Sequence, residues 1–210
     1  MIDCPKCKTK QEFNFISFVS ASDSKELKVQ LLKHELNKFI CQNCGCAEVV
    51  DNSLMYLDGD KKFMLYSLYG QDAGESLESL KRTASFPPDF KIRLVENAEE
   101  MIDKVRIFDV GLKDTAVEYF KAMIVMQAVK SGKPQPDGIY FRGIEKSRRV
   151  DTLAFDVYSG SGVTPFYTPL EQAMKTMDEY PDDFGELSEL GKLVVNLETL
   201  CLWLQKKGKG

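Results

Sequence analysis

The sequence has a single histidine, His34, among its 210 residues. It therefore lacks the HExxH motif, in which two histidines and a glutamate build a catalytic zinc site. It also has no apolar run approaching the ~20 residues of a membrane-spanning helix, and no apolar segment near Met1 of the kind that forms a secretory signal. We therefore expect a cytoplasmic protein without a membrane segment.

An excess of positive charge is also missing. The net charge is −4, residues 1–70 are neutral, and residues 71–210 carry 19 basic and 23 acidic side chains. Proteins that bind duplex nucleic acid usually present a positive face, because phosphate contacts supply most of their affinity. The balance argues against nucleic acid and favours proteins as partners.

Six cysteines stand out against an ordinary globular composition, with 43% hydrophobic and 29% charged residues. Inside a cell thiols stay reduced, so paired cysteines indicate a metal site or catalysis before disulfides. Four of the six form two CxxC pairs separated by 33 residues, namely Cys4, Cys7, Cys41 and Cys44. Zinc prefers four ligands in a tetrahedron, and a two-residue gap lets one tight turn supply two thiolates. The spacing predicts one structural Zn²⁺ ion.

The residues around each pair suit such turns. Pro5 pre-sets φ at the second turn position. Gly45, directly after the second pair, fits the left-handed position where such a turn ends, and Lys8 holds the equivalent place after the first pair. We therefore expect the first turn to be the less ideal of the two.

Redox catalysis and catalytic zinc are the competing interpretations. A thioredoxin-type CxxC begins a helix that follows a strand, whereas three residues precede Cys4, and the second pair would go unexplained. A catalytic zinc keeps an open position, usually with histidine or carboxylate among its ligands. Four thiolates close the shell and make the ion a poor Lewis acid, so we expect a structural site.

Several other residues have a functional and a plain interpretation. His34 and Cys46 lie close enough in sequence to be substitute ligands. We expect instead that His34 is a partly exposed helix residue and that Cys46 is a thiol beside the metal site. Cys201 is expected to act as a small hydrophobe on an apolar helix face. The basic run 146–149 is expected to be a hairpin loop rather than a phosphate site. The acidic pairs are expected to be solvated surface; they are Glu99–Glu100, Asp178–Glu179 and Asp182–Asp183.

Hydrophobic periodicity predicts an α+β fold. Residues 1–70 are expected to form a zinc-ribbon-like antiparallel sheet with an inserted helix over 24–37, capped by Asp23, and a hairpin turn at 58–60. Residues 71–91 are expected to be a linker with a short helix over 75–84. Residues 92–210 are expected to form a larger mixed α/β region. Its predicted helices cover 96–107, 114–130, 168–179 and 192–206, and its predicted strands cover 139–145 and 150–159, with 160–162 a loop.

The first third of the chain resembles the CpXC domain family, named for paired Cys-Pro-Xaa-Cys motifs about this far apart. The resemblance rests on residues 4–7, 41–45, 54–56 and 60–64, and more weakly on 107–114. Gln42 stands where the family has proline, which removes no ligand. The resemblance implies a metal-binding domain, and it carries over no catalytic residues.

The sequence therefore favours a structural-zinc protein that acts as a non-enzymatic interaction or scaffold protein. The hairpin near Gly59 and the C-terminal helix are the expected partner surfaces. A nucleic-acid-associated zinc-ribbon factor is the alternative. An enzyme with its site in residues 92–206 is less favoured, because that region has no histidine and no recognisable nucleophile motif.

Overall fold

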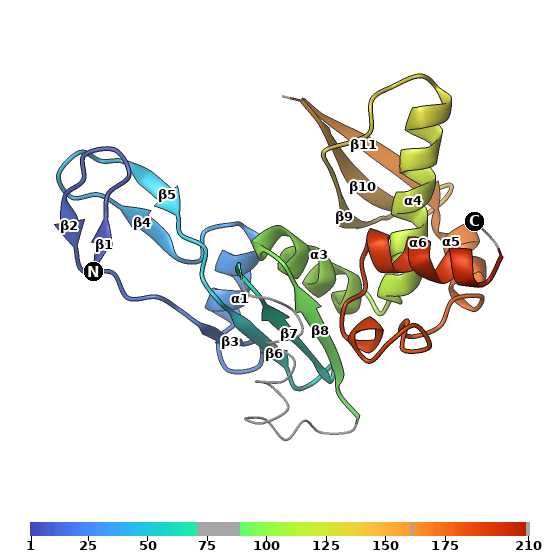
Figure 1. Ribbon diagram of the computed structural model, residues 1–210, viewed down its shortest axis with the longest axis horizontal. Coiled ribbons are helices and arrows are strands. Elements are labelled where there is room, and N and C mark those ends of the chain that lie inside the picture. Colours follow the sequence, from blue (N-terminus) through green and yellow to red (C-terminus); the bar gives the residue numbers. More distant parts are fainter. Residues whose placement is uncertain (71–88, 161, 209–210) are drawn as a thin grey trace. The chain divides into compact units, whose positions relative to one another are not determined.

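A computed structural model describes residues 1–70, 89–160 and 162–208 (Figure 1). Helices and strands are both well represented, so the expected α+β class is confirmed. The chain divides into two compact units, Met1–Ala98 and Glu99–Gly210. Within the described residues, no helix is both long enough and apolar enough to cross a bilayer.

The N-terminal unit begins with two short antiparallel ribbons. Strand β1 (Ile2–Asp3) pairs with β2 (Lys10–Gln11), and β4 (Lys38–Ile40) pairs with β5 (Ala47–Val49). Each ribbon has one CxxC pair in its turn. These ribbons are the antiparallel N-terminal strands that the sequence predicts.

The same unit contains a four-stranded sheet in the order β3-β6-β7-β8. Its strands are β3 (Phe18–Ser20), β6 (Met55–Asp58), β7 (Phe63–Ser67) and β8 (Lys91–Val95). The hairpin β6–β7 is antiparallel, as expected, but β3–β6 and β7–β8 are parallel. The expectation of a purely antiparallel sheet is therefore wrong for this part. Parallel neighbours need a long crossover, and the segment between β3 and β6 supplies one that contains a helix and a ribbon.

Helix α1 (Lys25–Leu32) is shorter than the predicted 24–37. His34 and Asn37 both have φ of 57°, a left-handed conformation that ends the helix. The predicted Asp23 cap is absent. Ser24 occupies the cap position without a side-chain hydrogen bond, and the Asp23 carboxylate accepts a bond from Ser20 Oγ at 2.6 Å instead.

In the C-terminal unit a three-stranded antiparallel sheet has the order β11-β10-β9, and helix α4 lies beside it (Figure 1). The strands are β9 (Gly138–Glu145), β10 (Thr152–Ser159) and β11 (Gly162–Pro169). The helices are α3 (Ala98–Asp109), α4 (Asp114–Lys130), α5 (Leu170–Met177), the short 3₁₀ helix η1 (Leu190–Lys192) and α6 (Leu197–Lys206). The prediction for α4 is confirmed to the residue. α6 begins later than predicted because Asn196 caps it, accepting a bond from Thr199 N at 3.0 Å.

Two strands that complete the sheets differ from the sequence prediction. The expected loop over 160–162 and the expected helix from Thr168 overlap the two ends of β11, yet all eight of its residues pair with β10. β8 completes the sheet of the N-terminal unit, whereas the expected ranges 1–70 and 92–210 assign most of it to the second region. The helix expected over 75–84 and most of the expected linker 71–91 lie outside the described residues.

Candidate metal centre

The two CxxC turns have equivalent backbone hydrogen bonds. Cys4 N–H donates to the carbonyl of Thr9 at 3.0 Å, and Cys41 N–H donates to the carbonyl of Cys46 at 2.8 Å. In the other direction, the N–H of the residue four positions after each first cysteine returns to its carbonyl at 2.9 Å. The two turns are thus copies of one structure, in which Cys46 occupies the place of Thr9.

The left-handed residue of each turn lies where the sequence predicts it. Lys8 has φ of 58° and Gly45 has φ of 67°. A Cβ added to Gly45 would meet no atom within 4 Å, so glycine is favoured there by backbone conformation alone. Lys8 adopts the same conformation with a side chain, which confirms that the first turn is the less ideal one.

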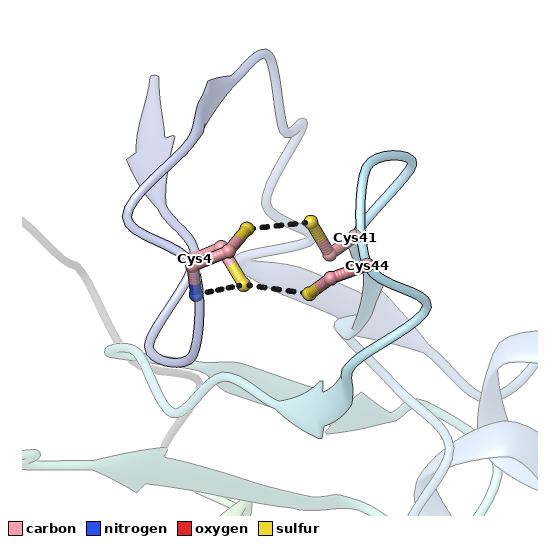
Figure 2. A group of neighbouring side chains, drawn as sticks. Cys4, Cys41 and Cys44 are labelled. Atoms are coloured by element: carbon pink, nitrogen blue, oxygen red, sulfur yellow. Dashed lines mark hydrogen bonds between the residues drawn. The ribbon is translucent and has the colours of Figure 1, made fainter.

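These turns bring the four predicted ligands together (Figure 2). Cys4 Sγ lies 3.7 Å from Cys44 Sγ, Cys7 Sγ lies 3.6 Å from Cys41 Sγ, and all four sulfurs lie within 4.8 Å of one another. A tetrahedron with Zn–S bonds near 2.3 Å has sulfurs about 3.8 Å apart. A disulfide needs about 2.05 Å, and all six cysteines are free thiols. The spacing fits a tetrahedral metal ion.

Neighbouring polar groups favour the thiolate at two of the sulfurs. Thr9, through its hydroxyl and its N–H, and then Asn43 lower the pKa of Cys7 to about 5. Asn43 Nδ2 lies 3.6 Å from Cys7 Sγ, and Thr9 Oγ1 lies 3.3 Å from it. The backbone N–H of Cys7, 3.5 Å from Cys4 Sγ, likewise lowers the pKa of Cys4.

Cys44 in the second turn behaves differently. The N–H of Cys46 favours the Cys44 thiolate, yet burial and the neighbouring thiols together raise the pKa of Cys44 to about 12. Several thiolates this close repel one another, so the last proton is retained. A divalent cation at their centre would offset that repulsion, because metal binding releases thiol protons.

The cysteines are also the middle of a small apolar cluster. Cys4, Phe39 and Cys41 are fully buried, and partly buried side chains surround them, including Ile2, Phe13 and Val50. The Phe13 ring meets Phe39 edge-on at 5.8 Å. A core of this size contributes little to stability on its own, so the ribbons depend on what holds the sulfurs.

The other candidates from the sequence are not among the side chains placed to hold the metal. In the described residues, the only group of three or more histidine, cysteine or acidic side chains placed to hold a metal is the four-cysteine group. His34 is exposed and follows α1 instead of lying within it. Cys46 is partly buried and packs against the cluster. Cys201 is exposed on α6, so its expected place on an apolar face is wrong.

The basic run 146–149 is the expected loop between two strands. Ser147 Oγ donates to the carbonyl of Val150 at 2.7 Å and accepts N–H bonds from Arg149 and Val150. The side chains of Lys146, Arg148 and Arg149 are exposed.

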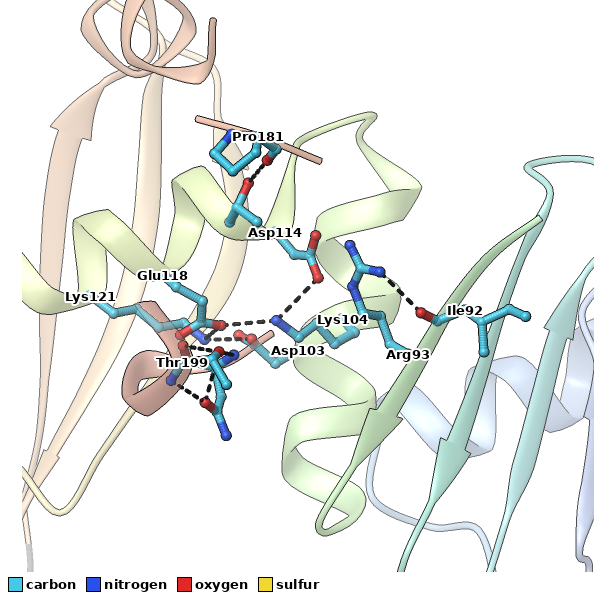
Figure 3. A network of polar contacts seen from close by, with 11 residues as sticks. Ile92, Arg93, Asp103, Lys104, Asp114, Glu118, Lys121, Pro181 and Thr199 are labelled. Atoms are coloured by element: carbon cyan, nitrogen blue, oxygen red, sulfur yellow. Dashed lines mark hydrogen bonds and ion pairs between the residues drawn. The ribbon is translucent and has the colours of Figure 1, made fainter. Parts of the chain in front are cut away.

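A buried ionic network in the C-terminal unit was not found by sequence reasoning (Figure 3). Lys104 Nζ lies 3.0 Å from Glu118 and 3.4 Å from Asp114, and Lys121 Nζ lies 3.0 Å from Glu118 and 2.6 Å from Asp103. The five side chains are at least nine-tenths buried. No local pattern in the sequence marks these side chains as buried, since Lys130 of the same helix is exposed.

Comparison with known proteins gives one match. A family model described as "CpXC protein" matches residues 2–121, which include both CxxC turns, α3 and part of α4. No curated protein and no solved structure matches the chain.

Proposed function

The chain belongs to the CpXC protein family, and from that premise we propose that Cys4, Cys7, Cys41 and Cys44 hold one Zn²⁺ ion in a structural site. The observation that carries the proposal is the spacing of the four sulfurs, which matches a tetrahedral ZnS₄ centre. The equivalent turns, each ending at a left-handed residue, also support it, because each supplies two thiolates from a rigid loop.

The structural role follows from the donor set. Four thiolates leave no open position for water or substrate, and their charge makes the ion a weak Lewis acid. An ion in this place would instead join β1–β2 to β4–β5 across a cluster with very little apolar burial. Metal-binding free energy would then act as folding free energy for these ribbons, as in zinc fingers.

We further propose that the protein acts as a non-enzymatic interaction or scaffold protein in the cytoplasm, where thiols stay reduced. Exposed apolar side chains on the N-terminal unit support a protein partner: Phe15, Phe18, Ile40 and Val49. Single exposed apolar residues are ordinary, but several on one small unit indicate contact with another macromolecule.

Native mass spectrometry tests the metal proposal. The wild-type chain should carry one zinc ion, and Cys4→Ser and Cys44→Ser should each lose it. Cys201→Ser is the matched control, because it removes an exposed thiol far along the chain and should retain full zinc content. A fully folded wild-type chain that takes up no zinc would contradict the proposal.

A further inference from the structure

The sheet β9–β10–β11 has two different faces. Strand register places Phe141 opposite Phe155, and their rings meet at 5.7 Å on the buried face. Helix α4 covers this face and lines a cavity of about 300 Å³ together with Val157 and Phe166. Successive residues of a strand point to opposite faces. The residues that alternate with these buried ones along each strand therefore form a second face away from α4.

This second face is rich in tyrosine. We call it the tyrosine face and define it by Tyr140, Tyr158, Val163 and Tyr167. Tyr158 and Tyr167 are 41% and 47% exposed, and the rings of Tyr140 and Tyr158 meet edge-on at 5.7 Å. Tyrosine combines a large apolar ring with a polar end and few rotatable bonds, and is therefore well suited to contact with another protein.

An arginine holds the tyrosine face in place. Arg142 sits in a bulge of β9, since Phe141 and Gly143 oppose consecutive residues of β10. Its guanidinium donates to Asp156 at 3.0 Å, to Tyr167 Oη at 3.0 Å and to Glu145, and it lies 5.6 Å from the centre of the Tyr167 ring. The arginine charge is therefore already engaged by carboxylates, and its contacts hold the Tyr167 ring against β9.

The β11 edge of the same sheet is poorly suited to adding a strand. Among the described residues, β11 is paired on one side only. Leu170 N–H donates to the carbonyl of Asp151 at 2.8 Å, and hydrogen-bonded pairs alternate along an antiparallel ladder. The register then directs the nitrogens of Pro165 and Pro169 outward, where proline has no N–H to donate. A partner is therefore expected on the face and not at the β11 edge.

Charges lie at opposite ends of the tyrosine face. At one end are the exposed Asp137, just before β9, and Glu99; burial and then Glu99 and Glu100 raise the pKa of Tyr140 there. At the other end is the exposed basic loop 146–149. A uniformly charged polymer such as nucleic acid would gain at one end and lose at the other. A peptide of mixed charge would gain at both.

We propose that the tyrosine face binds an extended, proline-rich peptide segment of a protein partner, with a basic residue near Asp137 and an acidic residue near the loop 146–149. Proline-rich segments form preordered helices that dock on aromatic surfaces. Strand register places Tyr158 toward the Asp137 end and Tyr167 toward the loop end, so an extended peptide that runs along the strands between the two charges would pass both rings. The proposal rests on the interaction role proposed above, but not on zinc.

Fluorescence anisotropy with the full chain tests it. The probes are short labelled proline-rich peptides with an arginine at one end and a glutamate at the other, in both orders, and matched peptides with the prolines replaced by alanine. We expect saturable binding of one order of the proline-rich peptide. Tyr158→Ala and Tyr167→Ala should each weaken it about tenfold, because exposed aromatic anchors dominate such contacts.

The controls separate this proposal from the others. Tyr69→Ala removes an equally exposed tyrosine (50%) of the N-terminal unit and should leave binding unchanged. Cys4→Ser should also bind the peptide normally. Failure of the zinc proposal would therefore leave peptide binding intact and can be distinguished from failure of the peptide proposal. Unchanged urea midpoints would show that the tyrosine variants are folded. Absence of saturable binding to any peptide, equal binding by the tyrosine variants, or preferred binding of single-stranded DNA would overturn the proposal.

Discussion

The cysteine ribbons and the C-terminal unit both bury a cluster of groups that can carry charge, but they compensate it in different ways. In the C-terminal unit, Lys104 and Lys121 stand among three carboxylates, so the chain itself encodes both signs. In the ribbons, four sulfurs face one another, and the side chains that hydrogen-bond to them, Thr9 and Asn43, are uncharged. The first cluster is complete from sequence alone, whereas under the zinc proposal a cation from solution completes the second.

The cysteine ribbons also have a much smaller apolar core than the C-terminal unit. The ribbons bury Phe39 beside two cysteines. The C-terminal unit fully buries several large side chains, including Phe141, Phe155 and Phe184, with Trp203 packed on Phe184 at 5.8 Å. Short chain segments cannot bury enough surface to offset their lost conformational entropy, and structural metals are a common remedy. The comparison indicates that the two parts should respond to quite different perturbations.

Metal removal should produce the largest difference. With a strong chelator, amide hydrogen exchange in residues 2–50 should rise to nearly unprotected rates, since structural zinc contributes about 10–16 kcal/mol in zinc-finger peptides. Exchange in α4 and β10 should stay as slow as before. Hydrogen exchange with mass spectrometry reads both parts in one sample. Equal loss of protection in both parts would show that the C-terminal unit depends on the metal as much as the cysteine ribbons do.

Breaking the ionic network should destabilise the C-terminal unit and leave the cysteine ribbons unchanged, with a smaller effect than metal removal. Glu118→Gln leaves Lys104 and Lys121 without their shared carboxylate, and we expect a loss of about 3–5 kcal/mol in the urea unfolding of the C-terminal unit. Zinc content should not change. Glu171→Gln is the control: it removes the same charge from an exposed pair with Lys175, 2.8 Å away, and should change stability by less than about 0.5 kcal/mol.

The stability that Glu118 contributes to the C-terminal unit should depend on pH. Burial opposes ionisation of Glu118, but Lys104 and Lys121 outweigh it and lower the pKa of its carboxyl. A lowered folded-state pKa means that the stabilisation is complete above the ordinary value of about 4.3. It is lost as pH falls through the folded pKa, so the Glu118→Gln difference should be constant above about pH 5.

Exchanging the left-handed residues of the two turns should give the smallest effect. Lys8→Gly should relieve about 1 kcal/mol of backbone strain, and Gly45→Ala should introduce a similar amount. Competition with a zinc indicator should show affinity changes of about fivefold in opposite directions. Both residues lie outside the ligand set, so zinc stoichiometry should stay at one. Equal affinities in all three chains would show that turn conformation does not limit metal binding.

The sequence was most informative where local chemistry decides the structure. The two CxxC pairs, the left-handed Gly45 and the hairpin at 58–60 all depend on residues close together in the chain, and each was predicted. Helix α4 was predicted because its punctuation, Gly132 and Pro134, is unambiguous.

Features that depend on distant partners were missed. The parallel pairs β3–β6 and β7–β8 join segments far apart in sequence, so periodicity gives no register for them. β11 contains Pro165 and Pro169, which argue against a strand unless it is known to lie at an edge. No local pattern marked Lys104 and Lys121 as buried, because their partners come from other turns of α3 and α4.

The parallel strand β3 lies between the two cysteine turns, and that position bears on how the chain finds its fold. A metal ion joining Cys7 to Cys41 closes a loop that contains β3 and α1. Closing such a loop removes about 3–4 kcal/mol of entropy from the unfolded ensemble. Pairings between distant segments are the slow steps of folding. Early metal capture would therefore shorten the search by which β3 finds β6, so the ion would set the order of assembly as well as the final stability.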